Sequence, residues 1–264
     1  MKTALITGAS AGIGETFAQE LAKQQMNLVL VARSEQKLQS LAQELRSRYN
    51  IQVDTIIQDL TAPNAAKTVF DTVNQKGIII DLLVNNAGFG GYGDFVEQDG
   101  EKQVKIVQLN VLALVDLTHH FLPGMRDRRS GAIINMASTA GFQPMPYFSV
   151  YAASKAFVLS FSEALWAENQ RYNVKVLAVC PGPTDTSFFQ DAKFPEFLAK
   201  VAQANNTSKG VVVREALQAL DKNQSTVVPG DIRNHLVANI HRFLPREALT
   251  NLWKTILGTG IDKK

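Results

Sequence analysis

The stretch TGASAGIG occupies residues 7–14, directly after the short apolar run ALI at residues 4–6. Its glycines, Gly8, Gly12 and Gly14, follow the spacing GxxxGxG. Glycine has no Cβ, so it allows sharp turns and lets another group approach the backbone closely. We therefore expect a tight turn that joins a first strand to a first helix.

The remainder of the chain alternates short β-branched runs with longer amphipathic runs, which is typical of parallel strands connected by crossover helices. We expect strands over residues 4–7, 27–32, 53–58, 82–85, 132–136, 175–179 and 226–228. Helices are expected over residues 14–24, 35–49, 62–76, 103–125 and 151–172. The pattern predicts an α/β protein with a single-domain Rossmann fold, a doubly wound seven-stranded parallel sheet with helices on both faces. We expect this catalytic domain to cover residues 1–230, and residues 231–264 to form an amphipathic helical extension of the same domain.

Composition and charge argue against several classes of protein. The chain has 264 residues, of which 45% are hydrophobic and 19% charged, as in a soluble globular protein. Its net charge of +3 is modest and its 27 basic residues are spread along the chain, so nothing indicates nucleic-acid binding. No run of about 18 apolar residues is present, and the apolar start is too short for a signal peptide, so we expect a cytoplasmic protein.

Cysteine and histidine give no metal signature, and we expect no metal. Cys180 is the one cysteine, so no internal disulfide can form, and its place at the end of an apolar run favours a buried structural thiol. The histidines lack the i, i+4 spacing of a helical zinc site; they are His119, His120, His235 and His241.

A turn between the first strand and the first helix is where a doubly wound sheet binds the pyrophosphate of a dinucleotide, because the helix N-terminus offers free N–H groups to the anion. At the end of the second expected strand, where an acidic residue would bind the ribose 2′-hydroxyl of NAD, the chain has Arg33. A cation there suits a 2′-phosphate, which favours NADPH over NADH. Ser10 in the turn can also reach this phosphate. The alternative, that Arg33 is a solvated charge at a strand end, stays open.

A tyrosine and a lysine lie four residues apart in YAASK, downstream of Ser138. On a helix these positions share a face, so the Lys155 ammonium would favour the ionised Tyr151 phenol and lower its pKa. Such a phenol can donate a proton to a carbonyl oxygen while hydride reaches the carbon, or take it back. Ser138 follows the fifth expected strand, and its hydroxyl can hold the same oxygen. The four-residue spacing of Tyr151 and Lys155 is weak evidence for catalysis by itself, since the same spacing is common on solvated helices.

Taken in order, these motifs resemble those of the short-chain dehydrogenase/reductase family over about residues 2–228. The first half looks most like the branch that contains 3-ketoacyl and 17β-hydroxysteroid reductases. The GxxxGxG spacing is itself a feature of the family. The matching positions are Thr7, Gly8, Gly12, Gly14, Asp59, Asn85, Asn86, Ala87, Gly88, Asn110, Ser138, Tyr151, Lys155, Pro181, Gly182 and Thr186.

The resemblance implies a role for each matched position. The catalytic set is Asn110, Ser138, Tyr151 and Lys155. In it, Lys155 also hydrogen-bonds the nicotinamide ribose, and Asn110 holds a water that leads protons to Lys155. Asp59 meets the adenine amino group, and Thr186, with Thr184, holds the nicotinamide carboxamide. In full, the positions expected to bind the cofactor are Gly8, Ser10, Gly12, Ile13, Gly14, Arg33, Asp59, Leu60, Asn86, Ala87, Gly88, Tyr151, Lys155, Pro181, Gly182, Thr184 and Thr186.

The expected function is that of an NADPH-dependent carbonyl reductase, reversible as an alcohol dehydrogenase, acting on a small to medium apolar ketone or aldehyde. One alternative is a 3-oxoacyl-thioester reductase of fatty-acid metabolism, although similar carrier-protein reductases usually end soon after the seventh strand and this chain continues beyond it. The other is a scaffold that senses NADPH without turnover, but such relatives typically lack the tyrosine or the lysine.

The helix expected after residue 151 is apolar around most of its circumference, so one face needs cover beyond the sheet. A partner subunit is the simplest cover, and the family builds dimers and tetramers on this helix, so we expect a homodimer or homotetramer. A run of aromatic residues after PGPTDT either covers the substrate or packs on the core; it contains Phe188, Phe189, Phe194, Pro195 and Phe197.

The C-terminal extension, residues 232–264, predicts two amphipathic helices separated by Pro245. Six basic residues against two acidic ones give it a charge of +4. Its apolar faces can pack on the substrate cleft, on a second subunit or on an anionic membrane surface. We favour the first two, because Pro245 keeps each helix short and marginal for membrane binding without tertiary support. The apolar positions are Ile232, Leu236, Val237, Ile240, Phe243, Leu249, Leu252, Trp253 and Ile256.

Overall fold

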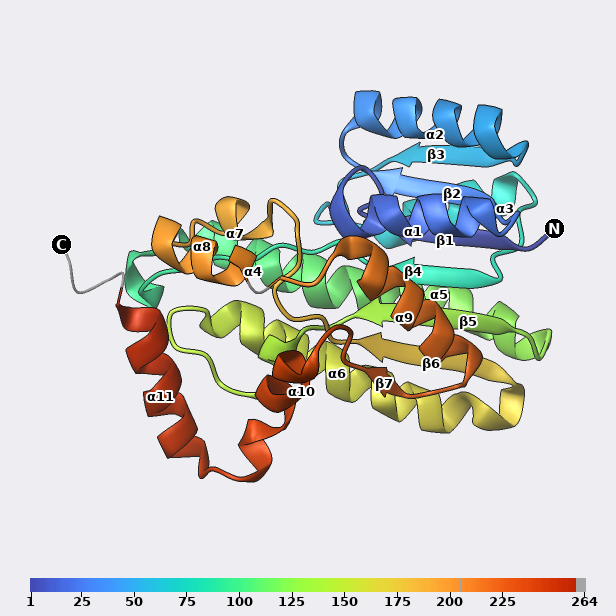
Figure 1. The fold of residues 1–264 in the computed structure, drawn as a ribbon. Coiled ribbons are helices and arrows are strands. Elements are labelled where there is room, and N and C mark those ends of the chain that lie inside the picture. The colour runs from blue at the N-terminus through green and yellow to red at the C-terminus, as the bar shows by residue number, and fades with distance from the viewer. Residues whose placement is uncertain (205, 260–264) are drawn as a thin grey trace.

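The computed structural model describes residues 1–204 and 206–259 (Figure 1). Seven parallel strands form one sheet in the order β3-β2-β1-β4-β5-β6-β7. The predicted doubly wound fold is confirmed, and each strand lies within one residue of its predicted bounds. The strands are β1 Thr3–Thr7, β2 Asn27–Ala32, β3 Val53–Ile57, β4 Leu82–Asn85, β5 Gly131–Met136, β6 Val174–Val179 and β7 Thr226–Val227.

Helices cover both faces of the sheet, because successive strand residues point to opposite sides. Ile6 packs in a core cluster with α1, α2 and α9, whereas its neighbour Leu5 packs with α3 and α5. The helices are α1 Gly12–Lys23, α2 Glu35–Tyr49, α3 Ala65–Gln75, α4 Gly100–Val107, α5 Ala113–Asp127, α6 Ser149–Asn169, α7 Phe188–Asp191, α8 Glu196–Ala204, α9 Lys209–Asp221, α10 Ile232–Asn239 and α11 Arg246–Gly258.

The single helix predicted over residues 103–125 is wrong. The chain there forms α4, then one π-helical turn (Gln108–Leu112), and then α5. A π turn hydrogen-bonds i to i+5, so it rotates the faces of the two flanking helices relative to each other. Such turns are frequent at functional sites, and this one contains Asn110.

Three other predicted helices have different ends. The helix predicted over 14–24 spans Gly12–Lys23. The helix predicted over 62–76 begins only at Ala65, because Asn64 adopts the left-handed conformation with φ +58°. The helix predicted over 151–172 begins at Ser149, and its last turn is a 3₁₀ helix (Gln170–Tyr172). The helices α7, α8 and α9 were not predicted.

The carboxyl ends of the strands face α7, α8, α10 and α11, while the amino terminus lies at the opposite edge of the sheet (Figure 1). The two helices expected in the extension are present as α10 and α11, and its last residues, 260–264, lie outside the described residues; they include Asp262, which entered the predicted charge. Much of the α10 apolar stripe is exposed, with Ile232 at 70% and Leu236 at 64%. No helix in the described ranges is long and apolar enough to cross a membrane.

Candidate active site

The turn at residues 7–14 joins β1 to α1, and its glycines have the conformations that such a turn needs. Gly8 and Gly12 have φ values of +64° and +63°, in the region that favours glycine. At Gly14 a Cβ would overlap the carbonyl oxygen of Gly8. The N-cap residue of α1, Ala11, provides no side-chain cap, so the first N–H groups of the helix can bind an anion.

The loop NNAG after β4 is tied to this turn by reciprocal hydrogen bonds. The Asn86 Nδ2 donates to the carbonyl oxygen of Thr7 at 2.9 Å. The Thr7 Oγ1 in turn accepts from the backbone N–H groups of Asn86 and Ala87, both at 3.0 Å. Two segments that were both predicted to bind the cofactor are therefore held side by side.

Arg33 follows β2 and Asp59 follows β3, and their Nη1 and Oδ2 atoms lie 3.9 Å apart. Burial raises the pKa of the Asp59 carboxyl, but hydrogen bonds from Thr61 and the Arg33 charge outweigh this effect and lower the pKa below its usual value. The Arg33 side chain remains 76% exposed. Its guanidinium lies at the surface beside one carboxylate and is open to a second anion.

Ser138 and Tyr151 come from different elements and meet at the carboxyl edge of the sheet. Ser138 follows β5 and is the N-cap of the 3₁₀ helix η3 (Thr139–Phe142), while Tyr151 lies in the first turn of α6. The Ser138 side chain is near enough to the Tyr151 phenol to lower its pKa. The Ser138 hydroxyl donates to the carbonyl oxygen of Pro181 at 3.4 Å. The two hydroxyl groups predicted to act together are therefore neighbours.

Lys155 lies one turn after Tyr151 on α6, but the ionisation of the pair differs from the prediction. The Lys155 Nζ donates to the carbonyl oxygen of Met136 at 2.7 Å and lies 5.6 Å from the centre of the Tyr151 ring. Burial raises the pKa of Tyr151 to about 12, although the Ser138 side chain lowers it. Burial also lowers the pKa of Lys155 to about 8. The expected lowering of the phenol pKa is wrong, because burial raises the pKa by more than Ser138 lowers it.

Asn110 is 1% exposed and holds two segments together from the π turn. Its Nδ2 donates to the Phe89 carbonyl oxygen and to the Ser154 hydroxyl, each at 3.0 Å, and its Oδ1 accepts from the Phe89 N–H at 3.1 Å. A Cβ at Gly88 would lie 3.0 Å from the same Oδ1. Ser154 was not predicted, and the one signal for it is a serine inside YAASK.

These positions can be compared with known proteins. A sequence model described as short chain dehydrogenase matches residues 2–196. The chain belongs to the short-chain dehydrogenase family.

Two kinds of relative support this assignment and the predicted branch. The very-long-chain 3-oxoacyl-CoA reductase of Rattus norvegicus is 31% identical over 263 residues, which are 97% of this chain and 78% of the rat protein. A 7β-hydroxysteroid dehydrogenase has a TM-score of 0.85 at 26% identity, with 96% of each chain covered. A short-chain dehydrogenase from Sphingobium yanoikuyae in complex with NADPH has a TM-score of 0.79 at 32% identity, with 95% of this chain and 96% of that chain covered.

In this short-chain dehydrogenase, the segment after β6 folds back over the glycine turn. A Cβ at Gly12 would lie 3.3 Å from the Thr186 methyl group. The Thr186 hydroxyl accepts from the Phe188 N–H at 3.3 Å, and the Thr184 hydroxyl donates to the Gly182 carbonyl oxygen at 3.0 Å. Thr184 and Thr186, predicted to hold the nicotinamide carboxamide, therefore lie on the loop that faces the predicted pyrophosphate site.

Asn234 of α10 supports this loop from behind and was missed by sequence reasoning. It occupies the space that a side chain at Gly182 would need. Its Nδ2 donates to the Thr207 hydroxyl at 3.1 Å and to the Pro229 carbonyl oxygen at 2.8 Å. No local pattern marks an asparagine in a helix as a contact of a loop some 50 residues away.

Aromatic rings surround Tyr151. Phe148 stacks on it with a centroid distance of 4.4 Å, and Phe188 lies 5.1 Å from it. Phe194 contacts Phe148 at 5.0 Å and Tyr92 at 4.5 Å. The sequence left open whether Phe188 and Phe194 cover the substrate or pack on the core, and both pack in the apolar cluster around Tyr151. We call Tyr92, Phe148, Phe188 and Phe194 the aromatic wall.

The C-terminal helix α11 docks beside this wall. The Tyr92 hydroxyl donates to the Leu257 carbonyl oxygen, and a Cβ at Gly258 would lie 3.1 Å from the Tyr147 ring. Leu249 and Leu257 are buried, whereas Leu252 and Ile256 are 40% and 42% exposed. Of the three surfaces considered for the extension, the end of α11 contacts the substrate side of its own chain.

The remaining predicted positions lie near the site without polar contacts that define a role. Ser10 is half-buried, Ile13 packs on the core from the first turn of α1, and Leu60 is buried. Cys180 is fully buried, as predicted for a structural thiol. No group of three metal-ligating side chains occurs in the part of the chain that the structure describes.

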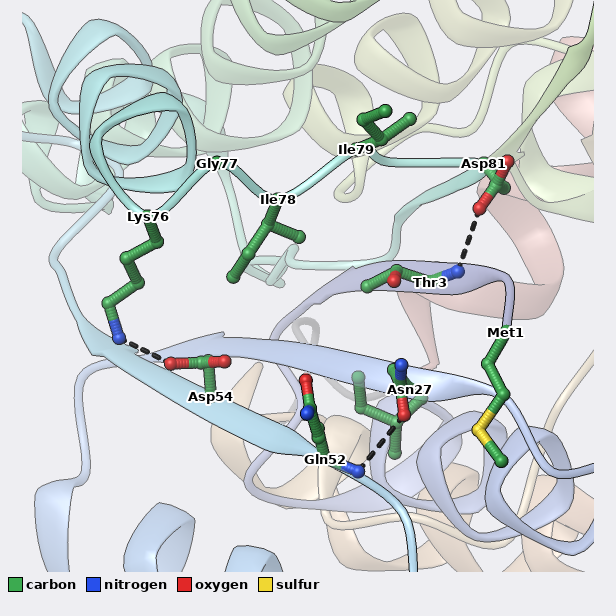
Figure 2. Close-up of a pocket in the computed structure, with 11 residues that line it drawn as sticks. Met1, Thr3, Asn27, Gln52, Asp54, Lys76, Gly77, Ile78, Ile79 and Asp81 are labelled. Carbon is green, nitrogen blue, oxygen red and sulfur yellow. Dashed lines mark hydrogen bonds and ion pairs between the residues drawn. The ribbon is translucent and has the colours of Figure 1, made fainter.

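A depression at the opposite edge of the sheet contains none of these residues (Figure 2). Its polar groups bind one another: Lys76 pairs with Asp54, and the Thr3 N–H donates to Asp81 at 2.8 Å (Figure 2). In a doubly wound sheet, ligands bind outside the carboxyl ends of the strands. The candidate site is therefore the region around Tyr151 and the glycine turn.

Proposed function

We propose that this chain is an NADPH-dependent carbonyl reductase, reversible as an alcohol dehydrogenase, acting on a ketone or aldehyde of a small to medium apolar molecule. The observation that carries this proposal is the neighbouring Ser138 and Tyr151 side chains, with Lys155 beside Tyr151 and aromatic rings around it. This combination offers a proton donor and an oxygen-binding group in apolar surroundings.

The residues at the carboxyl edge fit a nicotinamide dinucleotide. The glycine turn keeps its tight course because Gly14 lacks a side chain, and the start of α1 provides N–H groups that can bind a pyrophosphate. Thr184 and Thr186 would hold the carboxamide, Asp59 and Leu60 would border the adenine, and Asn86 to Gly88 would border the ribose. When bound, the dinucleotide supplies or accepts the hydride.

The side chains then handle the proton. Tyr151 keeps its proton at neutral pH because its pKa is about 12, so it can give that proton to the substrate oxygen as negative charge develops there. The Ser138 hydroxyl, which donates to the Pro181 carbonyl oxygen in the structure, can turn to donate a second hydrogen bond to the same substrate oxygen. Lys155, with a pKa of about 8, is still mostly protonated at neutral pH and resupplies the proton. The aromatic wall excludes water and strengthens these interactions.

The preference for NADPH rests on Arg33. Its exposed guanidinium can form a charge-assisted pair with a 2′-phosphate, which is absent from NADH. The Sphingobium relative in complex with NADPH supports this choice.

The test is the oxidation of NADPH, followed by absorbance, with a panel of ketones and aldehydes of increasing size, and the same panel with NADH. Turnover with several apolar ketones and a clear preference for NADPH are expected. Tight NADPH binding without turnover on any compound would instead indicate the non-catalytic scaffold.

A second candidate is a 3-oxoacyl-thioester reductase, because the rat relative is named a very-long-chain 3-oxoacyl-CoA reductase. Adding 3-oxoacyl thioesters of different chain lengths to the panel separates the two candidates. A kcat/KM that is high for thioesters alone would favour this second function.

We also propose a homodimer or homotetramer, in a cytoplasmic protein. Apolar side chains on α4, the π turn and α6 are exposed, with Val104 at 57%, Leu112 at 58% and Phe157 at 44%. α4 and α6 pack together, so these side chains belong to one region of the surface that a second subunit can cover. Light scattering of the purified protein measures the mass and contradicts the proposal if it gives a monomer.

A further inference from the structure

Among the residues that the structure describes, five buried side-chain atoms lack a hydrogen-bond partner. One is the Oδ1 atom of Asn85. Two are the Nε2 and Oε1 atoms of Gln143, and the others are His241 Nδ1 and Trp253 Nε1. Gln143 is only 5% exposed. A buried carboxamide that has lost its bonds to water without replacing them is unfavourable, so it needs an explanation.

The position of Gln143 in the chain provides an explanation for its unpaired carboxamide. The 3₁₀ helix η3 begins directly after Ser138 and ends at Phe142, so Gln143 is the next residue. At about 2 Å of rise per residue, Gln143 lies roughly 10 Å from Ser138 along this segment. The segment has little freedom to shift, because a Cβ at Gly141 would lie 2.7 Å from the Lys155 carbonyl oxygen. Gln143 therefore has a fixed place at the end of the segment that begins at Ser138.

The residues on either side of Gln143 contact the same cluster. Ala140 and Met145 both pack in the apolar cluster that contains Tyr151 and Phe148. The prolines at 144 and 146 keep the intervening chain extended. The Gln143 carboxamide is thus a polar group on a segment whose other side chains build the apolar wall around the phenol, where a hydrogen bond is strong.

We infer that the Gln143 carboxamide binds a hydroxyl group of the substrate, separate from the carbonyl that is reduced. The inference rests on the proposed reductase function and names its substrate class, a hydroxylated apolar ketone. A carboxamide offers a donor and an acceptor, and both atoms of Gln143 lack partners. A hydroxyl is the simplest group that can accept from Nε2 and donate to Oε1. Gln143 is then a specificity-determining residue, while the proton chemistry belongs to Tyr151.

The experiment compares 4-nonanone with derivatives that carry one hydroxyl group, placed one to four carbons from the carbonyl. It measures kcat/KM with NADPH for the unmodified protein and for Gln143→Met, which keeps the size of the side chain and removes both polar atoms. We expect kcat/KM for at least one hydroxylated ketone to exceed that for 4-nonanone by about 10- to 100-fold. This advantage should disappear in Gln143→Met, while kcat/KM for 4-nonanone changes less than about threefold.

Gln103→Met is the matched control. Gln103 is also a buried glutamine, at 6% exposure, but its Nε2 donates to Gln98 Oε1 at 2.7 Å. Gln103→Met should lower Tm, because it leaves the Gln98 Oε1 without its donor, and should change kcat/KM for all the ketones by a similar factor. Gln143→Met should leave Tm unchanged or raise it, because it removes an unsatisfied buried group.

Three results overturn the inference: equal kcat/KM for the hydroxylated ketones and the parent, an advantage that persists in Gln143→Met, or a fall in Tm of Gln143→Met as large as that of Gln103→Met. The last result would mean that the carboxamide has a structural partner. If neither these ketones nor any carbonyl compound in the wider panel is reduced, the proposed function itself fails, and the inference fails with it.

Discussion

The glycine turn with NNAG and the segment around residues 143–148 both border the same site, but their polar groups are satisfied differently. In the turn, Thr7 is joined to the loop after β4 by three hydrogen bonds, two with Asn86 and one with the Ala87 N–H. On the other side, Gln143 has two buried polar atoms without a partner in the described chain. The contacts between Thr7 and the NNAG loop are made within the chain, although the buried Asn85 Oδ1 of NNAG has no partner among the described residues, whereas both polar atoms of the Gln143 side chain lack one. Under the proposed function, chemistry common to the family belongs to the first region, the cofactor side, and selectivity to the second, the substrate side.

The largest effect is expected from removing the Tyr151 phenol, which the cofactor side and the substrate side share. Tyr151→Phe should lower kcat by at least about 1000-fold, because no other side chain in reach replaces its proton. NADPH affinity, measured by fluorescence titration, should stay within about threefold, since the change spares the cofactor side. Lys155→Ala is the contrasting variant and should damage both quantities. More than a few per cent of residual turnover in Tyr151→Phe would show that another group transfers the proton.

The second test asks how rigid the cofactor side is. In Gly14→Ala the new methyl group overlaps the Gly8 carbonyl oxygen, so the turn must move. We expect a loss of about 1–3 kcal/mol in the free energy of unfolding and a clear loss of NADPH affinity. Gly210→Ala is the matched control, since a Cβ at Gly210 has no atom within 4 Å. A normal Tm and normal NADPH affinity in Gly14→Ala would mean that the turn is more adaptable than its contacts indicate.

Cofactor choice is tested at Arg33. Arg33→Asp removes a charge-assisted contact to a 2′-phosphate and adds a repelling carboxylate, which together should cost about 2–3 kcal/mol for NADPH. The ratio of kcat/KM for NADPH to that for NADH should fall about 100-fold, with the value for NADH within a few fold of the original. Equal use of both cofactors by the unmodified protein would remove the basis for this assignment.

A truncation after Leu244 tests whether the substrate side can be altered separately. It removes α11, which contacts Tyr92 and Tyr147, but retains Asn234 behind the loop after β6. We expect kcat/KM for larger ketones to change by about tenfold, because the wall around the site loses support, while NADPH affinity stays within about twofold. A truncated protein with unchanged kinetics on every ketone would show that α11 serves another surface.

The smallest expected effect is in the pH profile. Burial lowers the pKa of Lys155 to about 8 and raises that of Tyr151 to about 12, so between these values the phenol keeps its proton while the amine loses its own. The kcat/KM for ketone reduction should therefore fall as pH rises through about 8, by at most tenfold per pH unit. NADPH affinity and circular dichroism over the same range control for losses of binding or folding. A flat profile up to pH 10 would exclude Lys155 as the group that resupplies the proton.

The two sides also differ in how far the sequence predicts them. The glycine turn, NNAG and YAASK are short, local patterns whose glycines and helical spacing have physical reasons, so their positions could be predicted before the fold was known. The strands were predicted as well, because runs of β-branched residues buried on both faces are easy to recognise. The π turn at Asn110 was missed, because no residue type marks it and the apolar pattern continues through it.

Long-range contacts explain the other errors. Burial by several segments at once raises the pKa of Tyr151, and the i, i+4 spacing alone predicts the opposite direction. No local sequence pattern marks Gln143, because its importance lies in the absence of a hydrogen-bond partner for its carboxamide. The helices α7 and α8 are short, and their aromatic residues fit a loop over the site as well as a packed helix.

The contact between Gly182 and Asn234 has a consequence for how this chain can change during evolution. The asparagine occupies the volume that any side chain at position 182 would require, and it also binds Thr207 and Pro229. A larger residue at 182 is therefore tolerated only together with a smaller one at 234, and neither change is neutral alone. Across homologous sequences, these two positions should vary as a pair. A chimera that joins residues 1–230 of this protein to the tail of a relative should fold well only when the donor also supplies an asparagine at the position of Asn234.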